Sequence, residues 1–201
     1  MRFALFVEGH TELALPGFLK RWLDPRLPRP IRIAPVNLEG SGGYLANFAQ
    51  RARKDLASGQ LIAVVGLLDL YGAAIEFPPG LDAKGKCTWA KADLENRVDD
   101  SRFRQHFAVH ETEAWLLSDP GIFPSGIARR IESLADHPEA VDLQEPPSKL
   151  LRRVYRAGGR DYKKVVDGSA LFERLDPIRA QASCPHLSLL LNDMLSLARA
   201  L

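Results

Sequence analysis

The feature that most constrains the fold is the apolar run at residues 61–68, which has no polar face. A strand that is apolar on both sides must be covered on both sides, as the central strand of a parallel sheet is. Three other strand-length segments, at residues 2–7, 31–38 and 103–110, are separated from it by stretches with helical spacing. This alternation predicts an α/β fold with a mostly parallel sheet flanked by helices.

Segments rich in glycine or proline precede two of the predicted helices. The glycine turn at residues 40–43 comes before a helix expected at residues 44–58. It lacks the Lys-Ser/Thr of a phosphate-binding loop, which favours a plain strand-to-helix turn over a phosphate site. A loop at residues 77–85, long enough to be a mobile flap, comes before a short helix expected at residues 89–98.

The character of the chain changes near Asp119, where prolines begin to separate short helical segments. We expect an α/β core at residues 1–118 and a helical C-terminal extension at residues 119–201, packed on the core as one compact unit. A Leu-rich helix at residues 186–200 could pack against a second copy in a homodimer. The prolines are Pro120, Pro124, Pro138, Pro146 and Pro147.

Composition restricts the compartment and the class of partner. The chain of 201 residues has a net charge of +2, which is too small to indicate nucleic-acid binding on its own. Cys87 and Cys184 fit no zinc-binding spacing and are typical of reduced thiols. The apolar N-terminal run is too short to span a membrane and lacks a cleavage-site pattern. We expect a cytoplasmic protein that does not associate with membranes.

Acidic residues follow three of the predicted strands. Glu8 and Glu12 follow the first, Asp69 ends the strand at residues 61–68, and Glu111 and Glu113 follow the strand at residues 103–110. The carboxyl ends of parallel strands open on one edge, so these carboxylates should converge there. Gathered carboxylates repel one another unless protons or a cation neutralise them. Mg²⁺, which prefers oxygen ligands, is the natural occupant.

Other roles are open for the same residues. Glu8 and Asp69 could cap or solvate loops, and Glu12 could lie in a first helical turn, where an acid suits the helix dipole. Glu111 and Glu113 share a face in a strand but oppose each other on a helix, so one could enter the site while the other supports it. His110 could be a ligand or a hydrogen-bonded neighbour.

Seven basic residues lie within sixteen positions, with only Asp161 to oppose them. Several of them are on one side of an amphipathic helix expected at residues 147–156, whose apolar stripe faces the other way. Such a run can follow a phosphate backbone, although it is also typical of a solvated helix face. The basic residues are Lys149, Arg152, Arg153, Arg156, Arg160, Lys163 and Lys164.

The motifs Val7-Glu8-Gly9-His10-Thr11-Glu12 and Leu68-Asp69-Leu70-Tyr71-Gly72, read together, resemble the Toprim domain of topoisomerases, primases and overcoming-lysogenization-defect (OLD) nucleases. The chain is similar to a family of small bacterial Toprim-like proteins, often encoded beside an AAA-type ATPase and some in phage-defence regions. Further marks of that family are His110-Glu111-x-Glu113-Ala-x-Leu-Leu, Pro138-Glu139, Pro147-Ser148-Lys149, Tyr162-x-Lys164 and Cys184-Pro185-His186. The resemblance implies a Toprim-like, Rossmann-like core.

The resemblance also implies roles for the acidic residues. Glu8 corresponds to the glutamate that binds metal or handles a proton, and Glu12 to the second acid of the OLD-type opening. Asp69 corresponds to the first aspartate of an Asp-x-Asp pair. Tyr71 stands in place of the second aspartate, and a phenol is a poor magnesium ligand at neutral pH. Either Glu111 or Glu113 completes the metal site, or metal binding is weakened.

The resulting hypothesis is a Mg²⁺- or Mn²⁺-dependent nuclease subunit in which a metal-activated water attacks a phosphodiester of nucleic acid. We expect the substrate to be DNA, although no motif in the chain distinguishes DNA from RNA. Lys149 and Lys164 match family motifs and would stabilise charge on the scissile phosphate. The resemblance implies an AAA-type ATPase partner, which the last helix could also contact. Two alternatives are a degenerate Toprim-fold adaptor without chemistry, favoured by Tyr71, and an enzyme of nucleotidyl or phosphoryl transfer.

Overall fold

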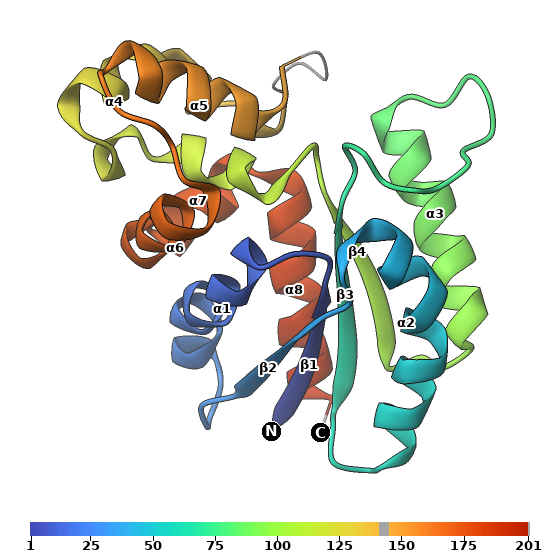
Figure 1. Ribbon diagram of the computed structural model, residues 1–201. Coiled ribbons are helices and arrows are strands. Elements are labelled where there is room, and N and C mark those ends of the chain that lie inside the picture. The colour runs from blue at the N-terminus through green and yellow to red at the C-terminus, as the bar shows by residue number, and fades with distance from the viewer. Residues whose placement is uncertain (141–144, 201) are drawn as a thin grey trace.

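A four-stranded parallel sheet forms the centre of the computed structural model, which describes residues 1–140 and 145–200 (Figure 1). The strands lie in the order β2 (Arg32–Asn37), β1 (Arg2–Val7), β3 (Ala63–Asp69) and β4 (Phe103–Ala108), and each neighbouring pair is parallel. Every residue of β3 is buried, as its unbroken apolar sequence requires. The predicted α/β fold with a parallel sheet is therefore confirmed.

Helices cover both faces of the sheet. α2 (Gly40–Ala57) and α3 (Ala83–Val98) lie on one face, and α1 (Leu15–Leu23) and α8 (Pro185–Arg199) lie on the other (Figure 1). Successive side chains of a strand point to opposite faces, so β1 contributes to two apolar cores. Phe3, Leu5 and Val7 join the core with α1 and α8, and Ala4 and Phe6 join the core with α2 and α3.

The direction in which strands are added reverses between β1 and β3. From β1 the chain moves outwards to β2, and it then returns past β1 to form β3 and β4 on the other side. In open α/β sheets a ligand-binding crevice forms at the carboxyl ends of the strands at such a point. Glu8 directly follows β1 and Asp69 ends β3, so both lie beside this crevice.

The described chain after β4 is helical. Its buried side chains join those of β1 and α1 in one core, which extends to Ala198. The remaining elements are η1 (Thr11–Ala14), η2 (Asp24–Arg26), η3 (Thr112–Ser118), η4 (Pro120–Ile122), α4 (Ser125–Ile131), η5 (Glu132–Leu134), η6 (Pro138–Ala140), α5 (Pro147–Ala157), α6 (Lys164–Arg174) and α7 (Pro177–Ser183).

The helix α2 begins earlier than predicted. The expected glycine turn at residues 40–43 is in fact the first turn of the helix, which starts at Gly40 instead of residue 44. A side chain at Gly43 would overlap the backbone carbonyl oxygen of Leu38. The glycine therefore lets the first turn lie against the end of β2, which is a packing requirement that helix propensity does not reveal.

The helix α3 is also longer than predicted, because it starts at Ala83 instead of residue 89. Asp82 supplies the helix start, since its side chain accepts a hydrogen bond from the Gly85 N–H at 2.7 Å. This is an ordinary N-cap, and it converts the end of the expected loop into two further helical turns.

The Leu-rich helix α8 buries much of its apolar face within the described chain. Leu187, Leu190 and Met194 are fully buried in the core beneath the sheet. The Glu139 carboxylate caps the start of α8 by accepting hydrogen bonds from the His186 N–H at 2.8 Å and the Leu187 N–H at 3.3 Å. The Pro138-Glu139 and Cys184-Pro185-His186 motifs thus meet at this cap.

The state of the cysteines and the character of the helices bear on the expected compartment. Cys87 and Cys184 are buried free thiols. Among the described residues, no helix combines the length and apolar character needed to cross a membrane.

We predict that Gly66→Ala destabilises the protein by about 1–3 kcal/mol, because the new methyl group would overlap the Tyr44 hydroxyl and the Gln105 side-chain oxygen in the centre of the sheet. Urea unfolding measures this loss. Gly42→Ala is the matched control, since Gly42 is exposed in α2 with open space around it. The free energy of unfolding of that variant should be unchanged or higher by up to about 1 kcal/mol.

Candidate metal centre

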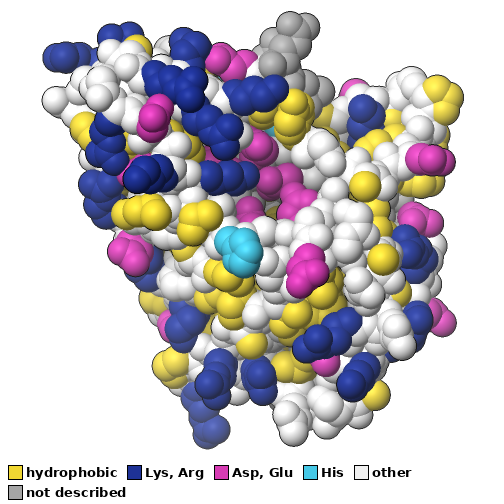
Figure 2. Space-filling view, in the orientation of Figure 1, with side chains coloured by type: hydrophobic (Ala, Val, Ile, Leu, Met, Phe, Trp, Pro, Cys, Tyr) yellow, Lys and Arg dark blue, Asp and Glu magenta, His cyan; other side chains and the backbone are white. Residues whose placement is uncertain are grey.

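The carboxylates predicted to converge do meet at the carboxyl edge of the sheet. One oxygen from each of Asp69, Glu111 and Glu113 can be chosen so that all three lie within 4.8 Å of one another. These residues are only 7%, 7% and 0% exposed. Figure 2 shows acidic side chains gathered in a hollow of this face, beside Lys and Arg side chains.

Both glutamates of the segment after β4 enter the cluster, although only one was expected to. Glu111 has extended backbone angles, with φ −143° and ψ 157°, and Glu113 lies in the first turn of η3. The backbone changes from extended to helical between them, so neither the strand rule nor the helix rule for alternate residues applies. His110, just before them, is buried, and its carbonyl oxygen accepts a hydrogen bond from the Tyr71 N–H.

Glu8 and Glu12 border the cluster on the side of β1. Glu8 Oε1 accepts a hydrogen bond from the Asp69 N–H at 3.3 Å. Glu12 is 4% exposed, and its Oε1 accepts from the Thr112 hydroxyl at 3.4 Å. A Cβ atom on Gly9 would lie 2.8 Å from Glu12 Oε2, so the glycine of the opening motif makes room for this carboxylate.

Thr112 joins the acids from the two sides of the crevice. Its N–H donates to Asp69 Oδ1 at 3.0 Å, and its hydroxyl donates to Glu12. The sequence did not single out this residue. Its position between two glutamates at a strand end was the available signal.

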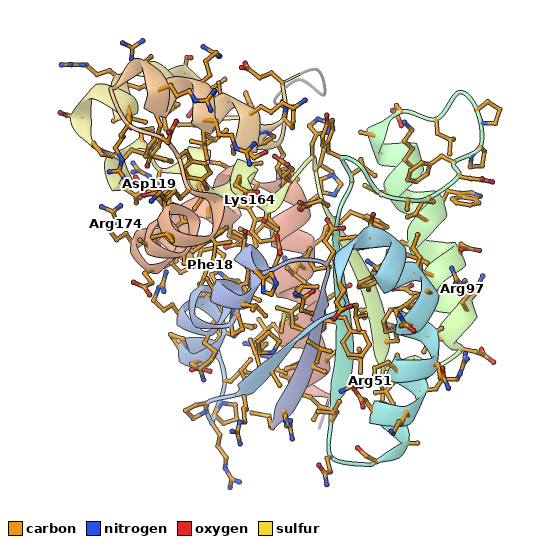
Figure 3. All side chains as sticks on the ribbon, in the orientation of Figure 1. Phe18, Arg51, Arg97, Asp119, Lys164 and Arg174 are labelled. Atoms are coloured by element: carbon orange, nitrogen blue, oxygen red, sulfur yellow. The ribbon has the colours of Figure 1, made fainter. Side chains whose placement is uncertain are left out.

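Lys164 is the cation at the centre of the acids (Figure 3). Its Nζ lies 3.2 Å from Glu113 Oε1, 3.9 Å from Asp69 Oδ2 and 3.9 Å from Glu111 Oε1. Since α6 starts at Lys164, the helical part of the chain delivers this side chain to the edge of the sheet. One ammonium group cannot balance the charge of all the surrounding carboxylates.

Burial, together with the excess of negative charge, raises the pKa of several acids. Burial raises the pKa of Glu8 to about 7, and nearby Glu12 adds to that shift. Burial likewise raises the pKa of Glu113 to about 7, against the opposing effect of Lys164. Burial and the charge of Glu113 raise the pKa of Asp69 well above its usual value. The cluster therefore holds protons near neutral pH unless another cation enters.

The surrounding carboxylates raise the pKa of Lys164. Burial alone would lower the pKa of this ammonium group, but the charges of Glu113, Asp69 and Glu111 outweigh burial and stabilise its protonated form. Lys164 is thus a cation at neutral pH and is unsuited to act as a base.

The donor set fits a hard divalent cation. Among the described residues, neither Glu113 oxygen nor Glu12 Oε2 has a hydrogen-bond partner, although all three atoms are buried. Oxygen atoms so placed have unused capacity for Mg²⁺ or Mn²⁺, which take carboxylate ligands. Glu111 has less, because its two oxygens accept from the Ser148 N–H at 2.7 Å and the Ser148 hydroxyl at 2.9 Å.

Lys149, the other lysine expected to act on a phosphate, lies at the rim of the site. It is exposed, and its Nζ is 3.3 Å from the Tyr71 hydroxyl and 5.7 Å from the centre of the Tyr71 ring. Its neighbour Ser148 connects it to the cluster through Glu111. The Pro147-Ser148-Lys149 motif therefore places a buried serine, hydrogen-bonded to Glu111, next to an exposed lysine.

The predicted basic run is more strongly paired with acids than the sequence indicated. Asp161 was expected to be the only opposing charge, but three of the arginines form ion pairs: Arg153 with Glu145, Arg156 with Asp161, and Arg160 with Asp167. Glu145 lies before α5 and Asp167 lies within α6, so these two contacts depend on how the chain folds back. Arg152 and Lys163 form no ion pair with any described residue and are exposed.

Residues 7–195 match the sequence profile of a family described as Domain of unknown function (DUF4276). The chain belongs to this family. Among curated proteins there is no significant match. A solved structure, the C-terminal region of the Burkholderia pseudomallei OLD protein, is similar at 18% sequence identity with a TM-score of 0.48, over 96% of this chain and 98% of that one.

We predict that the DUF4276 domain becomes less stable as the pH rises from about 5 to about 8 in EDTA, and that Glu113→Gln reduces this loss. Below pH 7 the folded protein keeps a proton on Glu113 that the unfolded chain has released at its usual pKa of 4.5. Stability from this group is therefore lost as the pH rises through the folded pKa, by roughly 2 kcal/mol.

Urea unfolding of the two proteins at both pH values measures the difference. The comparison reports Glu113 together with Asp69, whose pKa the charge of Glu113 raises. Buried His106, whose pKa is lowered by burial, is common to both proteins. Glu173→Gln, an exposed change on α6, should keep the wild-type pH dependence. An equal loss of stability in wild type and Glu113→Gln would contradict the assignment.

Proposed function

We propose that this chain is a metal-dependent nuclease subunit that hydrolyses phosphodiester bonds in nucleic acid. The observation that carries the proposal is the cluster of Asp69, Glu111 and Glu113 around Lys164 at the point where the strand order reverses. Acid groups that bind divalent cations, next to a lysine and a basic helix, suit a substrate with a phosphate backbone. The resemblance of the Glu8 and Asp69 motifs to Toprim supports the same chemistry.

Asp69, Glu111 and Glu113 would hold Mg²⁺ or Mn²⁺, with Glu8 and Glu12 beside them. When bound, the ion would supply Lewis-acid activation and neutralise negative charge on the phosphate. Glu113 is the better ligand of the two glutamates after β4, because Lys164 pairs with Oε1 alone, whereas both oxygens of Glu111 accept hydrogen bonds from Ser148.

Glu8 and Lys164 would handle protons and charge in the hydrolysis. Glu8 would accept a proton from the attacking water, since a pKa of about 7 is suited to a general base near neutral pH. The water oxygen would form a bond to phosphorus while the bond to the leaving oxygen breaks, and the leaving oxygen would take a proton from a solvent water. Lys164, kept protonated by its neighbours, would donate hydrogen bonds to a non-bridging phosphate oxygen.

A second candidate is an adaptor subunit that binds partners without catalysing a reaction. Tyr71 favours it, because this residue replaces an acid of the Toprim motif and its hydroxyl contacts Lys149 at the rim. An adaptor has no need of a metal ion. Calorimetric titration with Mn²⁺ therefore separates the two candidates before any activity is measured.

The wider context of the proposal comes from the motif resemblance. We propose that the helical extension packs on a core ending near residue 118, and that an AAA-type ATPase works with this subunit on DNA in the cytoplasm, in phage defence or DNA processing. Lys149, Arg152, Arg153, Arg156, Arg160 and Lys163 would form the nucleic-acid-binding face. Figure 2 shows Lys and Arg side chains concentrated over the region of α4, α5 and α6.

We predict that purified protein with Mn²⁺ cuts supercoiled plasmid or circular single-stranded DNA, and that Asp69→Asn abolishes the cutting by removing a charged ligand. Glu8→Gln should lower the rate by about 10²–10⁴-fold, the usual contribution of a general base. Gel electrophoresis of time courses measures both effects.

Glu173→Gln is the control for this experiment, since it removes an exposed acid on α6 far along the helix from Lys164. It should cut at the wild-type rate. Absence of both cutting and calorimetric Mn²⁺ binding, with the ATPase and ATP also present, would favour the adaptor. Cutting that survives in Asp69→Asn would mean that the chemistry lies elsewhere.

We predict that Arg152→Ala weakens DNA binding more than Arg153→Ala does. Arg152 has no acid partner among the described residues, whereas Arg153 forms an ion pair with Glu145, with Nε 2.6 Å from Oε1. Removing one phosphate contact should reduce the slope of log affinity against log salt concentration by about 1. Fluorescence anisotropy over a salt series measures the slope, and a larger effect from Arg153→Ala would exclude this arrangement.

A further inference from the structure

Tyr71 is an exposed aromatic side chain close in sequence to the buried acid cluster. It follows Asp69 by two residues and is 36% exposed, while the three clustered acids are at most 7% exposed. It belongs to neither apolar core. The fold therefore has no packing use for the exposed part of this ring.

The backbone around Tyr71 is held in place. Its N–H donates to the His110 carbonyl oxygen at 2.9 Å, and the Ser41 hydroxyl donates to the Gly72 carbonyl oxygen at 3.3 Å. These bonds attach the turn after β3 to the segment after β4 and to the start of α2. The ring is thus presented at a fixed place on the rim of the site.

A lysine ammonium group accompanies the ring. Lys149 forms no ion pair with the residues that the structure describes, unlike Arg153 and Arg156 on the same helix. Its ammonium group instead lies 3.3 Å from the Tyr71 hydroxyl and 5.7 Å from the ring centre. Ser148, bonded twice to Glu111, holds the start of α5 beside the cluster. An aromatic face and an ammonium group with no ion pair to any described acid therefore lie together at the rim of the site.

The depth of the acids restricts the shape of a substrate. A phosphodiester must reach side chains that are 7% exposed or less, and the backbone of a stiff duplex cannot bend into such a recess without distortion. A single strand can bend sharply, and its bases are free to stack on an aromatic ring while its phosphates contact basic groups. Tyr71 and Lys149 offer one group of each kind.

We propose, on the basis of the nuclease function above, that the substrate is single-stranded or locally unpaired nucleic acid, with Tyr71 stacking on the base next to the scissile phosphate. Lys149 contacts the adjoining phosphate oxygen. Tyr71 is then a specificity-determining residue and not a failed metal ligand.

The test is binding of a fluorescein-labelled single strand and of a blunt-ended duplex without a loop, measured by anisotropy in EDTA so that nothing is cut. Wild type should prefer the single strand. Tyr71→Ala should weaken its binding roughly 5- to 150-fold, the range for one stacked base, while Tyr71→Phe keeps most of the affinity. Trp89→Ala is the matched control, because Trp89 is also exposed but lies on α3 against Phe77.

A second measurement uses single strands that carry one abasic position in turn. At the position that faces Tyr71, loss of the base should weaken binding by wild type but have little further effect on Tyr71→Ala. Equal affinity for strand and duplex, or losses in Tyr71→Ala and Trp89→Ala of the same size, would overturn the inference.

Cleavage with Mn²⁺ separates this inference from the nuclease proposal. If duplex and single strand are cut at equal rates, and Tyr71→Ala does not change these rates, the nuclease proposal holds and the inference of a single-stranded substrate is wrong. Tyr71-dependent binding of single strands without any cutting would support the recognition and reject the hydrolysis.

Discussion

The site depends on one constraint, which is that like charges are packed where water cannot screen them. Asp69, Glu111 and Glu113 lie almost completely buried around Lys164, and that single ammonium group cannot neutralise them. Burial in a medium of low dielectric makes each ionised carboxylate costly, so protons or a divalent cation must complete the balance. The hydrogen bonds from Thr112 and Ser148 reduce this cost without removing it. The cluster is therefore a place built for a positive charge.

The same constraint ties the two parts of the chain together. The strands supply the acids, but Lys164 and Ser148 come from helices that follow them in sequence. Glu111 belongs to both groups, because its carboxylate faces the cluster and also holds the start of α5. The basic surface of α5 is consequently fixed relative to the acids. A nucleic-acid strand bound along that surface would lead to the cluster. A change at Glu111 would disturb the acids and the helix together.

Much of the fold and the centre of the site could be predicted from the sequence. The apolar run of β3 indicated a parallel sheet, and parallel strands bring Glu8, Asp69 and Glu111 to one edge by geometry alone. The starts of α2 and α3 could not be predicted, because Gly43 and Asp82 act through contacts that only the folded chain supplies. The ion pairs of Arg153 with Glu145 and of Arg160 with Asp167 were not predicted, for the same reason. The binding roles of the basic residues remain predictions.

The placement of α8 has a consequence for how the protein is made. This helix is the last element of the described chain, yet its leucines fill a core that it shares with α1, and it contacts α1 and β4. Until it arrives, α1 covers its face of the sheet without α8, and the contacts between α1 and α8 that close the core span most of the chain length. Such long-range contacts slow folding and leave apolar surface open to aggregation in the meantime. A nascent chain of this protein should therefore need protection on the ribosome until α8 has emerged.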